Sequence, residues 1–471
     1  MEARLHELAD AVPASVLEAP DRDRSLQSLL EELATRRVPT GRIHRAWSLG
    51  TLTARIAAGW GVTFLRGAFA GADERERLEN ERRLRAALLV FGRMGYLRGA
   101  VLKVGQLVSC YPKLVPDELA DTLTKLHFEA PPMHYALLAE SVRKELGQDP
   151  EEVFASFERE AFAAASLGQV HRATARSGEP LAVKVQYPGI ARTIESDFRN
   201  LSLLSAPMRL GADGDNLAAQ LAYVRDMLLL ESDYGSEAHF LELAHAALAD
   251  MDGVVVPRPH RETSTRRVLS MDHVEGQHVD EWLATNPAQG ERDDLGDRFF
   301  RATTRLFFGA RLCWGDPHPG NLLVTPSGDL ALLDFGSCRA FDAAEWELMR
   351  AGADAYRAGE DELRAVMIRG CDLSPKQAAD PDRMRYLLDY ANWMWEPMAA
   401  GDEPFDFRDP AYIQRGMALF GEASSKRYTR ALPVNLYNAR FLYGARVLCH
   451  RLGARVQAGR IMCEELERAG L

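Results

Sequence analysis

The chain has 471 residues, of which 46% are hydrophobic and 27% are charged, so it can bury at least one large core. Its formal net charge of -11 argues against a nucleic acid partner, because phosphate binding requires clustered, uncompensated Lys and Arg. The six cysteines form no C-x-x-C pair, which argues against a structural zinc site and favours reduced thiols inside a cell.

The N-terminal third is predicted to be helical. Residues 1–40 are polar, lack the apolar core of a secretory signal, and read as a flexible tail of a cytoplasmic protein. Residues 41–150 repeat charged and apolar residues at helical spacing, which predicts an all-helical extension. Within it, residues 46–65 are about long enough to span a membrane, but Arg55 and the Gly, Ser and Thr residues favour a helix that packs on the protein or lies in a lipid interface. Any membrane contact would be peripheral, through residues 46–69 at the inner face.

The remaining chain is predicted to form two α+β lobes. Residues 151–275 contain β-forming segments, including FAAASLGQVHRATA and PLAVKVQYP joined by the turn RSGE, then a long helix over residues 217–248 and the strand segments VVVPRP and TRRVLSMDHVEG. Residues 276–471 are mostly helical, apart from the short strands NLLVTP and DLALLDFG. A small antiparallel sheet is therefore followed by a helical lobe.

A phosphate-loop pattern precedes a lysine in the predicted sheet. Protein kinases place G-x-G-x-x-G-x-V over the phosphates and a strand lysine downstream. Here the segment from Ala163 to Val170 reads A-x-A-x-x-G-x-V, with Gly168 at the third glycine position, and Lys184 follows in LAVKV. Taken alone, the segment could equally be an alanine-rich hairpin and Lys184 a surface lysine.

A second set of polar residues is more specific. WGDPHPGNLLV contains Asp316 and Asn321, and LLDFG contains Asp334. The spacing matches a kinase catalytic loop, D-x-x-x-x-N, followed by D-F-G, which supplies a catalytic carboxylate and oxygen ligands for Mg²⁺. The alternative is a turn, a cap and a strand end, but buried carboxylates at these spacings require a compensating charge such as a bound cation.

The predicted long helix carries three acids in LLLESDYGSEAHF. Asp233 and Glu237 are four residues apart and share a helix face, whereas Glu231 points elsewhere unless Gly235 bends the helix. A kinase needs one such glutamate to hold the strand lysine on the phosphates. The alternative is an acidic helix face exposed to solvent.

These motifs together resemble the UbiB/AarF/ADCK family of atypical protein-kinase-like ATPases. The resemblance runs from about residue 38 to about residue 456 and includes a K-x-G-Q motif at Lys103 and Gln106. It also includes the alanine-rich loop, the phrase KVQYPGI and an E-x-D pair at Glu231 and Asp233. The segments EPFDF and ARFLYGARVLCHRLGA are most similar to the coenzyme Q biosynthesis branch.

The resemblance implies an atypical kinase-like bilobal fold whose helical extension packs over the active site. In it, Lys184 would contact the phosphates of ATP and pair with Glu237, Asp316 would be the catalytic aspartate, and Asn321 with Asp334 would hold Mg²⁺. Lys103 and Gln106 would fold over the pocket, with Lys103 reaching Glu231 and Asp233 to block protein substrates. Other residues would line the nucleotide site: Ala163, Ala164, Ala165, Ser166, Gly168, Val170 and Met271.

The leading hypothesis is an ATP-hydrolysing or small-molecule-phosphorylating enzyme that supports ubiquinone or related isoprenoid lipid metabolism at a membrane surface. After Gly336 the chain lacks an A-P-E element, which also argues against a peptide substrate. A nucleotide-gated lipid-binding scaffold or chaperone-like pseudokinase is one alternative. An aminoglycoside- or choline-kinase-like phosphotransferase is another, because GDPHPGN is similar to the catalytic loop of those enzymes. The oligomeric state stays open, a homodimer included.

Overall fold

The computed structural model describes residues 133–165, 167–192, 194, 195, 198, 199, 222, 225–426, 428 and 433–471. Nearly all of them belong to one compact unit, Pro132–Pro188 with Ala219–Leu471. The predicted tail, the segment 46–69, Lys103, Gln106 and Ser166 lie outside the described residues. Among the helices that are described, none is long and apolar enough to cross a membrane.

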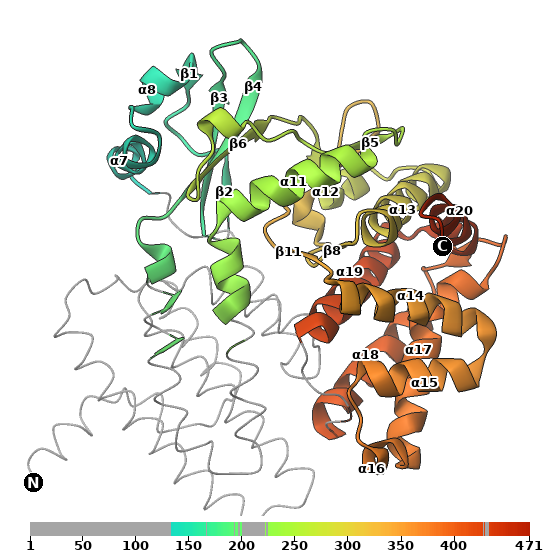
Figure 1. The fold of residues 1–471 in the computed structure, drawn as a ribbon. Helices are drawn as coiled ribbons and strands as arrows, with labels where there is room; N and C mark the ends of the chain where they lie inside the picture. Colours follow the sequence, from blue (N-terminus) through green and yellow to red (C-terminus); the bar gives the residue numbers. More distant parts are fainter. Residues whose placement is uncertain are drawn as a thin grey trace, which may run out of the picture. The chain divides into compact units, whose positions relative to one another are not determined.

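An antiparallel sheet forms the first part of this unit (Figure 1). Its strands run in the order β1-β3-β4-β6, and β2 pairs with β3. The turn between β3 and β4 contains Gly178 at φ +104°, a left-handed angle that suits glycine. The elements are α7 (Tyr135–Leu146), α8 (Pro150–Val153), β1 (Ser156–Phe157), β2 (Ala163–Ala165), β3 (Gly168–Thr174), β4 (Pro180–Gln186) and β6 (Val268–Asp272).

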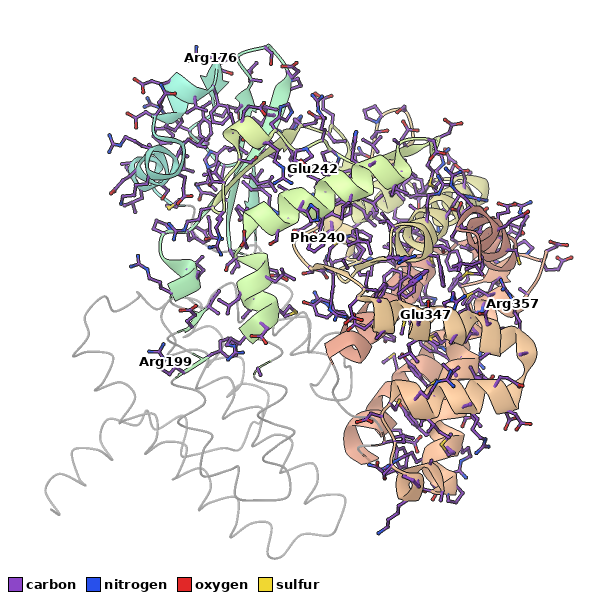
Figure 2. The ribbon with its side chains drawn as sticks, viewed as in Figure 1. Arg176, Arg199, Phe240, Glu242, Glu347 and Arg357 are labelled. Atoms are coloured by element: carbon purple, nitrogen blue, oxygen red, sulfur yellow. The ribbon has the colours of Figure 1, made fainter. Side chains whose placement is uncertain are left out.

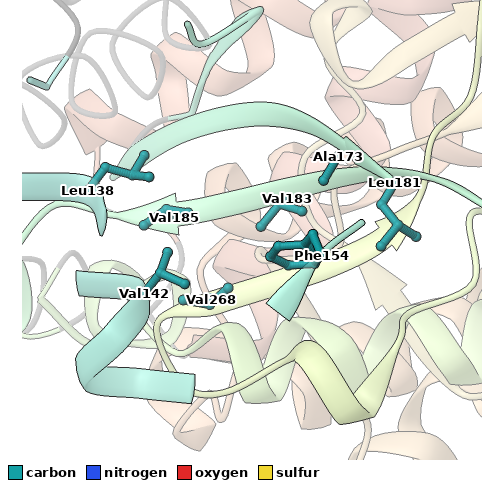
Figure 3. Close-up of a cluster of buried hydrophobic side chains, with 8 residues drawn as sticks. All are labelled: Leu138, Val142, Phe154, Ala173, Leu181, Val183, Val185 and Val268. Carbon is teal, nitrogen blue, oxygen red and sulfur yellow. The ribbon is translucent and has the colours of Figure 1, made fainter. Parts of the chain in front are cut away.

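One face of the sheet packs against α7, and Figure 3 shows the resulting core. Leu138 and Val142 of α7 are fully buried against Val183 and Val185 of β4. Side chains alternate between the two faces of a strand, so Lys184, between these valines, points to the opposite face. The hydrophobic core on one side of β4 thus fixes a cation on the other.

The predicted helix over residues 217–248 is wrong as one continuous element. Residues 225–231 are helical, but the chain turns at 232–233 and α11 (Tyr234–Leu248) begins anew. The cause is Asp233, which caps α11 by accepting hydrogen bonds from the backbone N–H groups of Gly235 and Ser236. Asp233 and Glu237 therefore do not share a face of one long helix.

The second part is mostly helical, as the sequence predicts. It contains α12 (Val279–Ala284), α13 (Gln289–Thr304), a π-helical turn (Arg305–Gly309), α14 (Ala343–Ala358), α15 (Glu360–Gly370), α16 (Pro375–Ala378), α17 (Pro381–Ala399), α18 (Pro410–Lys426), α19 (Pro433–Leu452) and α20 (Ala458–Arg468). In Figure 1 these helices occupy the yellow to red part of the chain.

The second part also contains a small sheet and two pairs of short strands. β5 (Val254–Val255), β10 (Leu330–Leu332), β9 (Leu322–Val324) and β7 (Gln277–His278) form a second sheet in that order. The two strand segments predicted after the long helix join different sheets. β5 pairs in parallel with β10 in the second sheet, whereas β6 pairs with β4 in the first sheet. Two further pairs are β8 (Leu312–Trp314) with β11 (Cys338–Ala340), and β12 (Phe405–Asp406) with β13 (Arg455–Val456).

Candidate active site

A buried ion pair joins the first sheet to α11. Lys184 Nζ on β4 donates a hydrogen bond of 2.6 Å to Glu237 Oε1, and the two side chains are only 7% and 3% exposed. Lys184 Nζ also lies 3.5 Å from Asp334 Oδ2, at the end of the second sheet. The structure therefore brings together three of the residues that the sequence predicted to form one site.

Burial and charge act in opposite directions on this pair. Burial disfavours the ammonium of Lys184, but the carboxylates of Asp334 and Glu237 more than offset it, so the pKa of Lys184 lies above its ordinary value. Burial also raises the pKa of Glu237 to about 7, although Lys184 lowers it in part. Lys184 stays charged and can neutralise an anion that approaches Asp334.

Tyr234, at the first position of α11, holds Lys184 from a further side. The ammonium lies 5.3 Å from the centroid of the Tyr234 ring, within the range of a cation–π contact. Tyr234 is 2% exposed, and burial raises the pKa of its phenol above the ordinary value. The sequence analysis did not select Tyr234, whose only signal was its position between two of the predicted acids.

The D-F-G segment is held by its own backbone and by Trp314. The Gly336 N–H donates to Asp334 Oδ1 at 2.9 Å, and the Trp314 indole N–H donates to the Asp334 carbonyl at 2.7 Å. Phe335 is fully buried and stacks on Trp314 with centroids 5.9 Å apart. The Asp334 side chain is 37% exposed, so it can meet a ligand.

A short loop between β8 and β9 positions Asp316 and Asn321. The Asn321 side-chain amide donates to the Asp316 carbonyl at 3.0 Å. The Asn321 carbonyl accepts from the N–H of Leu333, the residue before Asp334, at 3.0 Å. This hydrogen bond continues the antiparallel pairing of β9 with β10 by one more step. The pairing therefore places Asn321 beside the D-F-G segment, although 13 positions separate Asn321 from Asp334.

Asp316 is paired with an arginine that the sequence analysis missed. Arg440 Nη2 on α19 lies 2.9 Å from Asp316 Oδ1, and the side chains are 6% and 15% exposed. Arg440 lies in the segment ARFLYGARV, which served only to show the resemblance. No local pattern could reveal the pair, because 124 positions separate the two residues.

The alanine-rich segment is a tight hairpin. Ala163 pairs with Val170 and Ala165 with Gly168 between β2 and β3, and Lys184 pairs with Val170 on the next strand. A Cβ atom on Gly168 would lie 2.3 Å from the Val185 carbonyl oxygen, so only glycine fits here. The backbone register thus brings Ala163, Val170 and Lys184 onto adjacent strands.

Met271 lies on β6, 6% exposed, opposite Ala182 of β4. Asp272, the last residue of β6, accepts a hydrogen bond of 2.7 Å from His260. A contact of Met271 with a nucleotide remains a prediction.

The E-x-D acids separate in the structure. Glu231 is 5% exposed and Ser337, next to the D-F-G segment, donates its hydroxyl to Glu231 Oε1 at 2.5 Å. Asp233 instead caps α11 and pairs with Arg266 at 3.0 Å. Figure 2 labels Glu242 and Phe240 on α11. Glu242 accepts hydrogen bonds from Arg261. The predicted contact of Glu231 and Asp233 with Lys103 cannot be compared, because Lys103 lies outside the described residues.

Asp334 and Asn321 carry the oxygen groups of the site that could hold a metal ion. No cluster of three or more His, Cys, Asp or Glu side chains able to hold a metal occurs in the described part of the chain. Mg²⁺ usually takes one or two carboxylates, and phosphates and water complete its octahedron. The hydrogen bond from the Leu333 N–H to the Asn321 carbonyl keeps Asn321 near Asp334, so the two side chains could supply the protein's share of such a site.

Comparison with known proteins decides the family. Residues 125–363 match the family model of the ABC1 atypical kinase-like domain. The chain belongs to this family. It is 28% identical over 446 residues to the atypical kinase COQ8, mitochondrial, of Saccharomyces cerevisiae, covering 92% of this chain and 86% of the yeast protein. It is 30% identical over 279 residues to AarF domain-containing protein kinase 1 of Xenopus laevis, covering 58% of this chain and 54% of that relative.

A solved structure supports the fold. The erythromycin complex of Rv3197 from Mycobacterium tuberculosis aligns with a TM-score of 0.56 at 24% identity, covering 83% of this chain and 98% of that one. Together with the ABC1 match, this likeness confirms the predicted kinase-like α+β fold. As a member of the ABC1 family with atypical kinases among its relatives, the chain is a kinase-type phosphotransferase.

Proposed function

We propose that this ABC1 protein binds ATP with Mg²⁺ between Lys184 and Asp334 and acts on the γ-phosphoryl group. The observation that carries the proposal is the position of Lys184 Nζ, 2.6 Å from Glu237 and 3.5 Å from Asp334. A buried lysine held by a helix glutamate and facing an aspartate is the arrangement that kinases use to bind phosphates. A structural ion pair alone would not need the second, partly exposed carboxylate of Asp334.

Each residue then has a separate task. Lys184 neutralises phosphate oxygens, and Glu237 and Tyr234 keep its ammonium in place. Asp334 and Asn321 would hold Mg²⁺, which neutralises charge on the β- and γ-phosphate oxygens when it is bound. Asp316 orients the attacking hydroxyl or water by accepting a hydrogen bond from it.

The acceptor that we propose is a lipid or isoprenoid quinone intermediate at a membrane surface. The resemblance to the coenzyme Q branch and the match to the yeast atypical kinase COQ8 support this assignment. Residues 46–69 would supply the peripheral membrane contact, and Lys103 with Gln106 would restrict protein substrates. The absence of an A-P-E element after Gly336 supports a small acceptor.

The test is ATP turnover by the full chain, measured with and without liposomes and phenolic quinone precursors, alongside Asp316→Asn. An enzyme predicts turnover that rises with lipid in the parent and is lost in Asp316→Asn while ATP binding remains. A nucleotide-gated scaffold predicts ATP binding in both proteins and equal, low turnover. The second result would remove the catalytic part of the proposal.

A further inference from the structure

One face of α19 contacts three consecutive residues of the loop that carries Asp316. Tyr437, Arg440 and Gly444 are spaced by three and four positions, so they lie on the same side of the helix. Arg440 pairs with Asp316, as described above, and its two helical neighbours lie against the residues that flank Asp316 in the sequence.

The flanking contacts leave no free space. A Cβ atom on Gly315 would lie 2.6 Å from the Ser337 carbonyl oxygen and 3.1 Å from Cδ1 of Tyr437. A Cβ atom on Gly444 would lie 2.8 Å from Cγ of Pro317. Glycine thus permits the closest approach of the loop to α19 on both sides of Asp316. The helix face fixes the loop before and after the aspartate.

Arg440 is itself held inside the protein. Its second nitrogen, Nη1, donates to the Met227 sulfur at 3.0 Å, and Met227 is 1% exposed in the helical segment that leads to Glu231. A thioether is a weak acceptor, so the charged partner, Asp316, dominates the position of the guanidinium. The side chain is 6% exposed, which limits screening of the pair by solvent.

Residues 315–321, the loop that carries Asp316, contain no Lys or Arg. Trp314 and Gly315 stand where kinases have His and Arg before the catalytic aspartate. His318 follows, but it is exposed and its Nδ1 accepts a hydrogen bond from the Gly320 N–H at 3.1 Å, as the cap of a 3-10 turn. α19 supplies an arginine beside Asp316 instead.

We propose that Arg440 is a positioning residue for Asp316: its guanidinium orients the Asp316 carboxylate toward the attacking group. This inference rests on the proposed function. The planar guanidinium is held by Nη2 on Asp316 and by Nη1 on Met227, so its direction is better fixed than that of a flexible ammonium. Reorganisation of the carboxylate during the reaction is then avoided.

The variants Arg440→Ala and Arg440→Lys test the inference in the full chain, by ATP turnover, Mg-ATP affinity and thermal unfolding. Loss of one preorganised charged donor predicts a fall in kcat of about 10²-fold in Arg440→Ala with little change in affinity. Added ethylguanidinium should restore part of that turnover, and Arg440→Lys should retain an intermediate kcat. The matched control is Arg451→Ala, on the same helix, which removes an exposed pair with Asp280.

The outcomes separate the two proposals. A kcat of Arg440→Ala equal to that of Arg451→Ala overturns the inference and leaves the proposed function standing. A loss of turnover that follows the loss of folded protein in both Arg440 variants, without rescue by ethylguanidinium, also overturns it, because the role is then only structural. A parent chain that binds Mg-ATP but shows no turnover contradicts the proposed function itself, and the inference falls with it.

Discussion

Lys184 on β4 and Glu237 on α11 form a buried ion pair, with 2.6 Å between Nζ and Oε1. The two residues are 53 positions apart in the sequence. Removing one partner of such a pair leaves a charge in a poorly solvated place. The pair therefore contributes to folding and also sets the direction of the ammonium toward Asp334.

We expect Glu237→Gln to lower the free energy of unfolding by about 3 kcal/mol, because Lys184 loses its nearest charged partner inside the protein. Urea unfolding measures the change. Glu242→Gln is the control on the same helix, since Glu242 and Arg261 form a solvent-accessible pair, and it should cost less than about 1 kcal/mol. Equal losses in the two variants would show that the Lys184 pair does not stabilise the fold.

We expect His171 on β3 to make the stability of the fold depend on pH. It is fully buried, its Nδ1 donates to the Glu158 carbonyl, and its Nε2 faces the side-chain N–H group of Gln169 at 2.8 Å. The Met133 N–H fixes this amide orientation by donating to the Gln169 oxygen. A second ring proton would therefore set one donor against another, and burial lowers the pKa of His171 below 6.5.

The unfolded chain takes up this proton more readily than the folded chain does. The free energy of unfolding should therefore be highest above pH 6.5, the ordinary pKa of an imidazole, and should fall as the pH drops below that value. Urea midpoints at about pH 7.5 and about pH 5.5 test this in the parent and in His171→Gln. The variant should show a smaller decline, whereas the exposed control His134→Gln should follow the parent. An unchanged decline in His171→Gln would assign the pH dependence to other groups.

Gly168 is predicted to be irreplaceable for steric reasons. In Gly168→Ala the new methyl would lie 2.3 Å from the Val185 carbonyl oxygen, a backbone atom of the central strand β4. Overpacking against backbone should cost about 3 kcal/mol and displace the alanine-rich hairpin. Gly290→Ala, in an open position of α13, should instead raise stability by about 0.5 kcal/mol. Thermal unfolding of both variants checks the opposite signs.

Local patterns in the sequence predicted the parts of the fold that local chemistry determines. The β3–β4 hairpin has a turn with a glycine at φ +104°, and the β9–β10 hairpin has another at Gly328, φ +86°. The polar spacing around Asp316 and Asp334 could be predicted for the same reason. Each of these features depends on residues that are close in sequence.

Features that depend on distant contacts could not be predicted. The start of α11 is a different case: the Asp233 cap is local, but helical periodicity that continues through residues 232–233 concealed it. The parallel pairing of β5 with β10 joins segments more than 70 positions apart. The Arg440–Asp316 pair likewise depends on how α19 packs, which hydrophobic periodicity does not specify.

The most direct test of the site is equilibrium binding of ATP in the presence of Mg²⁺ and in the presence of EDTA, by the parent, Asp334→Asn and the control Asp329→Asn in the neighbouring hairpin turn. The proposed site predicts that Mg²⁺ tightens ATP binding in the parent and in the control, and that Asp334→Asn loses this effect while remaining folded. Tight, Mg²⁺-dependent ATP binding by Asp334→Asn equal to that of the parent would contradict the account.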